Sequence, residues 1–505
     1  MVSIPSFKDP SFFDYLHTAT DDFWFEEEKK QTLALFSAAA AHVPAYKDFL
    51  QKNGVQPDRI RTWEDFQHVP AMNKVNYLRQ YDLPDLSWDG TFVGKNLVFT
   101  STSGSTGAPF YFPRTQDLDL QYATMVRLYL ERGSTSGPIL VIICFGMGVW
   151  IGGLITYKAF EIAGREMGCP ISLITPGNNK EEIFNALQHI APFFKQVIII
   201  GYPPFVKDIL DEAPSRNIDL SRIHVRLFFA AEAFTKQFRD YLVRTANIQN
   251  PYLDTMNIYG SADIGAMANE TPLSILIRDG ICNDKRLFTS LFGHISKTPT
   301  LAQYNPLFIH FETIDNKIHL TGNNAIPLIR YGIGDYGGVF RSSELYHILG
   351  EQGVSVAEQT EKTHIASTVT QLPFVYVYER ADLSVKLYGA IIYPEHVRMA
   401  LQDEELEHMV TGKFTMASRN DEAQNQFLDI HVELRKEIEH RPTLLEQIEK
   451  CIIQYLLRHN SEYANMTQMT PEKARPRVTL WVYESKPYFT PGIKQQWIAK
   501  ENKEI

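Results

Sequence analysis

The sequence predicts an α/β chain, with a large N-terminal domain of mostly parallel sheets layered with helices, a β-subdomain within it, and a small α+β C-terminal domain. Three observations carry this prediction. Between residues 96 and 261, apolar strand patterns alternate with helix patterns, which is typical of parallel α/β layering. Strands such as VIIIG (197–201) are apolar on both faces, as strands buried between helices should be. After Arg380 the pattern changes to short paired strands and helices.

The elements of the large domain follow in order along the chain. A helical pattern over 27–54 is broken at Pro44, because proline ends a helix that precedes it. Strands are expected at 96–100, 139–145, 170–175, 196–201, 224–231 and 254–261. Helices are expected between them, at 115–133, 153–166, 179–193, 205–213 and 235–246. From about 285 to 345 the pattern becomes rich in strands, which predicts the β-subdomain.

The C-terminal domain is expected at 380–505, roughly 125 residues, which is an ordinary domain size. Residues 381–401 predict a strand, a turn, a strand and a helix. Two paired strands are expected at 412–420 and 426–436, a helix at 443–460 and a last strand from 477. The large domain is then 1–379.

Composition and charge exclude some classes of partner. The 505-residue chain is 44% hydrophobic and 21% charged, with a net charge of −10 and no basic block. This balance argues against nucleic acid or an anionic membrane surface as the main partner. The four cysteines form no C-x-x-C pair, so we expect reduced thiols in a cytoplasmic protein. The N-terminus lacks the basic and apolar regions of a secretory signal.

One uncharged stretch, residues 133–157, leaves two interpretations open. It is long enough to span a bilayer. Its six glycines and one proline favour a buried strand followed by a glycine-rich loop. Periodicity alone does not separate the two.

A loop of small hydroxyl and glycine residues, TSGSTGAP (102–109), lies between a strand and a helix. Small residues let backbone N–H groups approach phosphate oxygens, and hydroxyl groups donate further hydrogen bonds. No G-K-[ST] closes the loop, so it is not a Walker A loop. On this stretch alone, a phosphate site and a solvated linker are both open.

Further segments in a fixed order resemble the adenylate-forming superfamily, which includes acyl-CoA synthetases and adenylation domains, and within it the phenylacetate–coenzyme A ligase branch. The segments are STSGSTGAP (101–109), FFAAEAFT (228–235), NIYGSADIG (257–265), IRYGIGDYG (329–337), ERADLSVKLYGAIIYP (379–394) and YFTPGIKQQW (488–497). HVPAYKDFL (42–50), HVPAMNKVNYLRQY (68–81) and the glycine-rich 146–164 also resemble that branch. The resemblance covers nearly the whole chain.

The resemblance implies an enzyme that activates a carboxylic acid with ATP and Mg²⁺. The product would be an acyl-adenylate, from which a thiol displaces AMP. The acceptor could be coenzyme A, a carrier-protein pantetheine or an amine. The small domain would be mobile and would rotate between the two half-reactions.

The same resemblance implies roles for particular residues. Lys494 would be the catalytic lysine, with Lys486 and Lys500 as nearby alternatives for that role. Asp263 would ligate Mg²⁺, and the alternative is that it caps a helix. The cofactor-binding residues would be Thr102, Ser103, Gly104, Ser105, Thr106 and Gly107 at the phosphates; Ala231, Glu232, Tyr259, Gly260 and Ser261 near adenine; Asp335 and Arg380 at the ribose; Asp382 at the hinge; and Gly389 beside the pantetheine. Phe145, Trp150, Tyr202, Phe205 and Phe229 fall in segments that should line an aryl or other apolar acyl pocket.

The chain also departs from the family pattern. Ala108 and Phe110 occupy the loop positions where a Lys or Arg is usual, so Arg114 is the nearest cation, and Ile493 stands where glycine is usual. Three readings follow: an acid–thiol ligase, an adenylating enzyme that loads a carrier protein or forms an amide, and a nucleotide-binding regulatory protein without turnover. The ligase is preferred because the key charged groups are present. The sequence does not determine the oligomeric state, and a homodimer is one of the possibilities.

Overall fold

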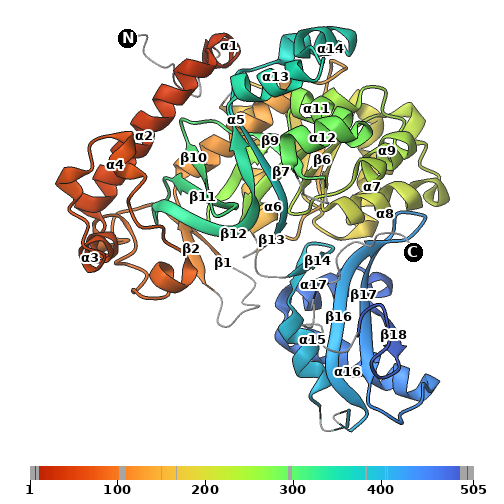
Figure 1. Ribbon diagram of the computed structural model, residues 1–505. Coiled ribbons are helices and arrows are strands. Elements are labelled where there is room, and N and C mark those ends of the chain that lie inside the picture. Colours follow the sequence, from red (N-terminus) through yellow and green to blue (C-terminus); the bar gives the residue numbers. More distant parts are fainter. Residues whose placement is uncertain are drawn as a thin grey trace. The chain divides into compact units, whose positions relative to one another are not determined.

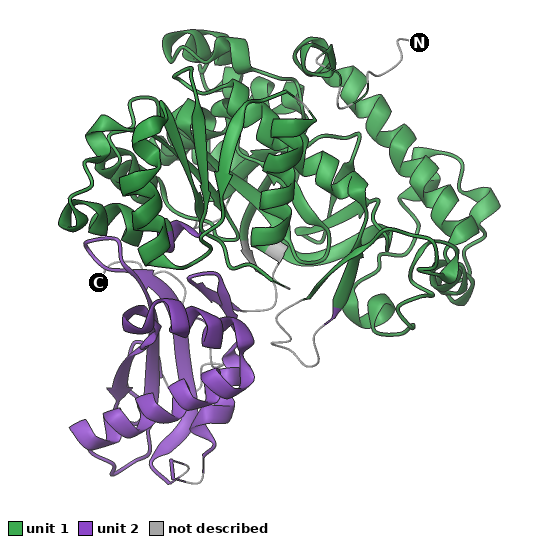
Figure 2. Cartoon of the chain, turned by 180° about the vertical axis from the view of Figure 1, so that it is seen from behind, with its two compact units in different colours: residues 1–101, 111–201, 206–379 green, residues 102–110, 202–205, 380–505 purple. Residues whose placement is uncertain are grey.

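The structure is a computed structural model (Figure 1). It describes residues 11–101, 110–148, 151–166, 168–293, 298–380, 384–403 and 408–489, with Ser6, Asp9, Glu405, Leu406 and Ile498. The chain forms two compact units (Figure 2). Unit 1 comprises Met1–Ser101, Tyr111–Gly201 and Val206–Glu379, and unit 2 comprises Thr102–Phe110, Tyr202–Phe205 and Arg380–Ile505.

Unit 1 is built on an 11-stranded sheet with a parallel half and an antiparallel half. The sheet order is β10-β11-β12-β13-β9-β8-β7-β6-β5-β3-β4. The parallel half comprises β4 (Ile171–Ile174), β3 (Ile139–Ile143), β5 (Gln196–Gly201), β6 (His224–Ala230) and β7 (Thr255–Ser261). Every residue of β3 and β5 is buried, because helices cover strands of this kind on both faces.

Helices α5 (Gln116–Glu131), α6 (Ile151–Arg165), α7 (Lys180–His189), α8 (Pro203–Glu212) and α9 (Lys236–Thr245) alternate with these strands. Their order along the chain, strand then helix then strand, is the connection that parallel neighbours require. The α/β prediction is confirmed, and each expected strand and helix of this region is present within a few residues of its expected bounds.

The antiparallel half continues the sheet from β7. It comprises β8 (Gly265–Asn269), β9 (Thr300–Gln303), β13 (Phe374–Arg380), β12 (Leu328–Phe340), β11 (Lys317–Gly322) and β10 (Ile309–Ile314). The helices of this region are α10 (Pro251–Asp254), α11 (Pro272–Asn283), α12 (Lys285–Phe292), α13 (Ser342–Glu351) and α14 (Val356–Lys362). The expected strand-rich region therefore starts too early, since residues 285–292 form a helix whose buried leucines pack on the neighbouring helices.

The N-terminal elements are α1 (Ser11–Thr18), α2 (Asp21–His42), α3 (Pro44–Lys52) and α4 (Trp63–Phe66), followed by the hairpin β1 (Val98–Ser101) and β2 (Tyr111–Arg114). The predicted break at Pro44 is confirmed. Buried polar contacts hold α2 on the sheet: Glu28 Oε1 accepts from Tyr304 Oη and pairs with His310 Nδ1, both at 2.8 Å. The N-terminal segments therefore form part of unit 1.

Unit 2 has a small α+β fold of its own. A hairpin joins β14 (Val385–Leu387) to β15 (Ala390–Ile392), and α15 (Pro394–Leu401) follows. The strands β16 (Val410–Asn420), β17 (Gln426–Leu434) and β18 (Arg477–Trp481) form the second sheet, with α16 (Pro442–His459), α17 (Ser461–Met469) and α18 (Pro471–Ala474) before β18. The expected pairing of the two long strands is confirmed as antiparallel.

The uncharged stretch 133–157 is divided between the buried strand β3 and the start of α6. In the part of the chain that the structure describes, no helix is both long enough and apolar enough to cross a membrane.

Candidate active site

The carboxyl ends of β6 and β7 bring several of the expected site residues to one edge of the sheet. The two strands are parallel neighbours, so the residues that follow them emerge at the same edge. Ala231 and Glu232 follow β6, while Tyr259, Gly260 and Ser261 end β7. In open α/β sheets, ligands bind at the carboxyl ends of the strands, so this edge is the candidate site.

Asp263 lies in the tight turn that joins β7 to β8. Ser261 pairs with Gly265 across the hairpin, and the backbone N–H of Asp263 donates to Ser261 Oγ at 3.2 Å. A Cβ at Gly260 would lie 2.8 Å from the carbonyl oxygen of Gly265, so only glycine fits this close approach. The alternative that Asp263 caps a helix is wrong, because a strand follows it.

Two side chains from distant segments contact the buried carboxylate of Asp263. Tyr331 Oη donates to Oδ2 at 2.7 Å, and Lys74 Nζ lies 3.1 Å from Oδ1. The side chain of Lys74 is 43% exposed, whereas that of Asp263 is 5% exposed. A buried carboxylate is thus paired with a cation that has free access to solvent.

The segment before Lys74 is held in place by hydrogen bonds. Lys74 is the first residue of a short π-helical turn, Lys74–Leu78. Asn73 Oδ1 accepts from the backbone N–H groups of Val75 and Asn76, and Asn76 Oδ1 accepts from the N–H of Asn73 at 2.7 Å. This reciprocal cap fixes where the turn begins, and so fixes the backbone of Lys74.

Arg114 supplies a second cation from β2. Its Nε donates to Thr100 Oγ1 at 3.0 Å, and its Nη2 donates to the carbonyl oxygen of Ala262 at 3.2 Å. Burial lowers the pKa of Arg114 to about 10, against the opposing effect of Asp119 and Asp263, so it is charged at neutral pH. A Cβ on Gly265 would lie 2.7 Å from Arg114 Nη1, which explains that glycine.

Tyr259 and Asp335 form a second contact between predicted site residues. Tyr259 Oη donates to Asp335 Oδ2 at 2.7 Å. The Tyr259 ring stacks near Phe311, with centroids 6.1 Å apart and an interplanar angle of 25°. Asp335 lies within β12. The strand directs its carboxylate toward β7.

The segment that follows β6 has an unusual backbone. Ala231 has a φ of +75°, a region that residues with a side chain rarely occupy. Glu232 is buried, and its carbonyl oxygen accepts from Asn257 Nδ2 at 3.0 Å. Backbone strain of this kind persists where the surrounding structure holds it, and it clusters at functional sites.

Comparisons with known proteins show what the whole chain is similar to. No family model matches the chain. A phenylacetate–coenzyme A ligase of Aromatoleum evansii is 26% identical over 239 residues, which is 46% of this chain and 50% of that protein. The Escherichia coli K12 phenylacetate–coenzyme A ligase is 24% identical, over 45% of this chain and 48% of that protein. The chain spans about half the length of the curated relatives it matches.

A solved structure extends the likeness in fold. The crystal structure of 2-hydroxyisobutyryl-CoA ligase with 2-HIB-AMP and CoA has a TM-score of 0.63 and 14% identity, over 94% of this chain and 90% of that one. The chain is similar in sequence to phenylacetate–coenzyme A ligases and has the fold of an adenylate-forming ligase. The resemblance that the motifs predict is thereby confirmed, and so is the adenylate-forming fold.

Several expected site residues lie outside the described residues: Thr102, Ser103, Gly104, Ser105, Thr106, Gly107, Trp150, Asp382 and Lys494. Of Arg380, the structure describes only the backbone, as the last residue of β13. The roles of the phosphate loop, the hinge and the catalytic lysine therefore stay predictions.

The expected acyl-pocket aromatics and the expected pantetheine glycine are placed individually. Phe145, Phe205 and Phe229 are buried, and Tyr202 is half-buried. Gly389 has a φ of +86° in the two-residue turn between β14 and β15, a turn that favours glycine by itself. Their contacts with an acyl group or a pantetheine stay predictions.

Sequence reasoning missed two residues of the site, Lys74 and Tyr331. Lys74 belongs to a segment quoted for its resemblance, but it received no role. Tyr331 could have been found, because residues 331 and 335 lie four apart in one strand and so share a face. Nothing in the local pattern shows that Lys74 meets Asp263, which is 189 positions away.

The site fits a magnesium ion that is held mainly by phosphates. Among the described residues, no three His, Cys, Asp or Glu side chains gather into a metal cluster. Magnesium in nucleotide sites uses one or two carboxylates together with substrate phosphates. Asp263 offers one such carboxylate, in contact with the partly exposed ammonium of Lys74, which Mg²⁺ could displace.

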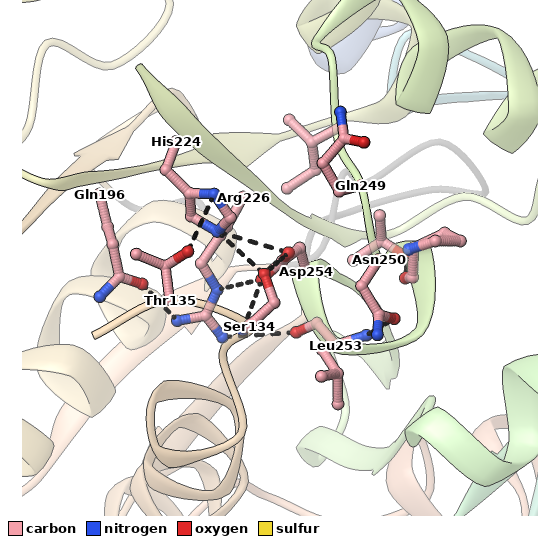
Figure 3. Close-up of polar contacts among 12 residues, drawn as sticks. Ser134, Thr135, Gln196, His224, Arg226, Gln249, Asn250, Leu253 and Asp254 are labelled. Carbon is pink, nitrogen blue, oxygen red and sulfur yellow. Dashed lines mark hydrogen bonds and ion pairs between the residues drawn. The ribbon is translucent and has the colours of Figure 1, made fainter. Parts of the chain in front are cut away.

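A different polar cluster lies at the opposite ends of β6 and β7 (Figure 3). Asp254 Oδ2 accepts from Ser134 Oγ and lies 3.4 Å from His224 Nε2. In serine nucleophile triads the carboxylate faces Nδ1 of the histidine and the serine faces Nε2. Here Ser134 and Asp254 both face Nε2, while Thr135 Oγ1 lies 3.3 Å from Nδ1. The cluster is therefore not a triad.

Proposed function

We propose that this chain is an AMP-forming ligase that activates a carboxylic acid and transfers it to coenzyme A. A carboxylate oxygen would attack the α-phosphorus of ATP, the bond to the β-phosphate would break, and pyrophosphate would leave. The thiolate of coenzyme A would then attack the acyl carbon, and AMP would leave. The curated relatives are named for phenylacetate, which favours an aryl acid as the substrate class.

The single observation that carries the proposal is the convergence at the carboxyl ends of β6 and β7. Segments far apart in sequence bring Lys74, Arg114, Tyr259, Asp263 and Asp335 to this edge. Two cations beside one carboxylate suit the phosphates of ATP with their divalent ion. A second carboxylate, held by a tyrosine, suits the two hydroxyl groups of a ribose.

Each described residue has a distinct part in this proposal. Asp335 would accept from the ribose hydroxyls, and the Tyr259 ring would lie near the adenine. Asp263 would hold Mg²⁺, which neutralises phosphate charge when it is bound. Lys74 would pass from Asp263 to a phosphate oxygen, and Arg114 would hold the turn through the carbonyl oxygen of Ala262.

The predicted residues outside the described part complete the proposal. Residues 102–107 would bind the β- and γ-phosphates, and Lys494 would neutralise the charge that develops on the α-phosphate. The side chain of Arg380, of which the structure describes only the backbone, would reach the ribose or a phosphate. Asp382 would be the hinge of the small domain. The cytoplasmic location and the state of assembly stay predictions.

The test is product analysis with purified protein, ATP, Mg²⁺, coenzyme A and phenylacetate, followed by mass spectrometry. We expect AMP and phenylacetyl-CoA in equal amounts from the wild type, and a large loss with Lys494→Ala. AMP release with no CoA thioester, but with an acylated carrier protein or an amide, would favour the second reading. ATP binding with no AMP from any of a broad panel of acids would contradict the proposal.

A further inference from the structure

Arg330 is a buried residue of β12 that contacts two segments far apart in sequence. Its Nε and Nη2 donate to the two carboxylate oxygens of Glu312 on β10, at 2.8 and 2.7 Å. Its Nη1 donates to the carbonyl oxygens of Gln67 and Val69. Glu312 neutralises the guanidinium, so the side chain is committed to groups of the protein itself.

The backbone of Arg330 and its neighbour Gly332 also bind Met72, a few residues after Gln67 and Val69 in the same N-terminal segment. Its carbonyl oxygen accepts from the N–H of Met72 at 3.1 Å, and the N–H of Gly332 donates to the carbonyl oxygen of Met72 at 2.8 Å. Arg330 adopts a φ of +50°, which is unfavourable for a residue with a side chain. Many contacts therefore hold one strained residue against residues 67–72.

Both groups that contact Asp263 lie next to these contacts. Lys74 follows Met72 by two residues and begins the capped turn described above. Tyr331 is the neighbour of Arg330 in the strand, and it donates to the second carboxylate oxygen of Asp263. The contacts of Arg330 with residues 67–72 thus set the position of the cation beside this carboxylate, whereas Tyr331 is held by the strand β12 itself.

We propose that Arg330 is a positioning residue, which holds residues 67–72 against β12 so that Lys74 reaches the phosphate side of Asp263. This inference rests on the proposed function for the role of Lys74. Arg330 itself does not contact the nucleotide in this account, because its guanidinium is bound to Glu312 and to backbone carbonyls. Its effect on nucleotide use must therefore pass through Lys74.

The test is a double-mutant cycle with Arg330→Met, Lys74→Met and the double variant. ATP–pyrophosphate exchange gives kcat and the KM for ATP, and hydrogen exchange reports the amide of Met72. The matched control is Arg239→Met, since Arg239 also pairs with a buried glutamate, Glu270, through two 2.6 Å contacts. Arg330→Lys keeps the charge but loses the bidentate contact with Glu312. This variant replaces Arg330→Met in the cycle if Arg330→Met does not fold.

We expect Arg330→Met to raise the KM for ATP by about 10- to 100-fold, as a misplaced group near the reaction does. The double variant should be no worse than Lys74→Met, because Arg330 acts through that lysine. Exchange at the Met72 amide should become at least about tenfold faster in Arg330→Met, and stay unchanged in Lys74→Met. Arg239→Met should lose stability and keep the wild-type KM.

Two outcomes would overturn the proposal. One is a KM that changes no more in Arg330→Met, or in Arg330→Lys, than in Arg239→Met. The other is a double variant in which the two effects multiply. If the wild type shows no exchange activity with any acid, the proposed function fails by itself. The Met72 amide then decides the positioning claim, and unchanged protection in both Arg330 variants would overturn it.

Discussion

The two ends of β7 carry buried aspartates in opposite surroundings. Asp254, just before the strand, receives a backbone N–H and a hydroxyl group from Ser134 and lies 3.3 Å from Arg226 Nε. The side chains of Asp254 and Arg226 are both 0% exposed. Asp263, just after the strand, is paired with Lys74, whose side chain is 43% exposed.

The comparison separates a structural carboxylate from one that can receive a ligand. At Asp254 the charged partner, Arg226, is as buried as the carboxylate, so no cation from solvent can replace it without breaking the fold. At Asp263 the cation is partly exposed, so a divalent ion from solvent can take its place on the carboxylate, while Tyr331 Oη remains bound to the other oxygen. Burial of the partner, rather than of the carboxylate, distinguishes the two ends.

The largest expected effect concerns stability at the first end. Asp254→Asn leaves Arg226 buried without its carboxylate, so we expect a loss of about 3–5 kcal/mol in the free energy of unfolding. Urea denaturation at pH 7 measures it. Kinetic constants per folded molecule should stay as in the wild type, and a loss below 1 kcal/mol would break the comparison.

The opposite pattern is expected at the second end. Asp263→Asn should lower acid-dependent ATP–pyrophosphate exchange by about 100-fold, because the variant loses the charge that a divalent ion needs. The free energy of unfolding should fall by less than in Asp254→Asn, because the partly exposed Lys74 can turn to solvent when its partner is lost. Comparable exchange in Asp263→Asn and wild type would place the metal site elsewhere.

Measurements over a range of pH test whether the ionised carboxylate of Asp254 stabilises the fold. Burial raises the pKa of Asp254, but hydrogen bonds from His224 and Ser134 and the charge of Arg226 outweigh it, so the pKa lies below its ordinary value of 3.8. A lowered folded pKa stabilises the fold above the ordinary pKa, and this contribution is lost as the pH falls through the folded value.

The difference in unfolding free energy between wild type and Asp254→Asn should thus be constant from pH 7 to about pH 5. It should shrink below about pH 4. Urea denaturation at each pH measures it. An equal difference at pH 3 and pH 7 would mean that the ionised carboxylate does not carry the effect.

The smallest effect concerns the carboxyl end of β6. Ala231→Gly removes the cost of a left-handed alanine, about 1–2 kcal/mol, against about 0.5–1 kcal/mol of extra chain entropy. We expect a net gain of about 0.5–1 kcal/mol in stability. The neighbouring Ala230→Gly, in the regular strand, is the matched control and should lose about 0.5–1 kcal/mol. Equal losses in both variants would show that Ala231 is not strained.

Much of the fold could be predicted from the sequence, because the pattern of apolar residues along a segment reflects which of its faces are buried. The continuous apolar run at 197–200 predicts a strand covered on both faces, and β5 is one. Lys285–Phe292 lies in the region where the sequence pattern predicts strands, although it forms a helix. The buried leucines of this helix belong to a cluster with residues of β9 and α13, and α13 is distant in sequence.

Some residues of the candidate site could be predicted from the sequence, and others could not. Tyr259, Asp263 and Asp335 could be named because their segments resemble known motifs, and the structure shows Tyr259 in contact with Asp335. The pairing of Lys74 with Asp263 could not be predicted, because it depends on how residues 67–72 dock on β12. Docking of this kind is set by tertiary contacts such as those of Arg330, and no local pattern encodes it.

The most direct test of the account is ATP–pyrophosphate exchange by the wild-type protein, with and without phenylacetate and a panel of other aryl and aliphatic acids. The account predicts exchange that requires both Mg²⁺ and an acid, that falls about 100-fold in Asp263→Asn, and that Asp254→Asn, per folded molecule, retains. No acid-dependent exchange in a folded protein that binds ATP would contradict it, and the carboxyl end of β7 would then be a nucleotide-binding site without turnover.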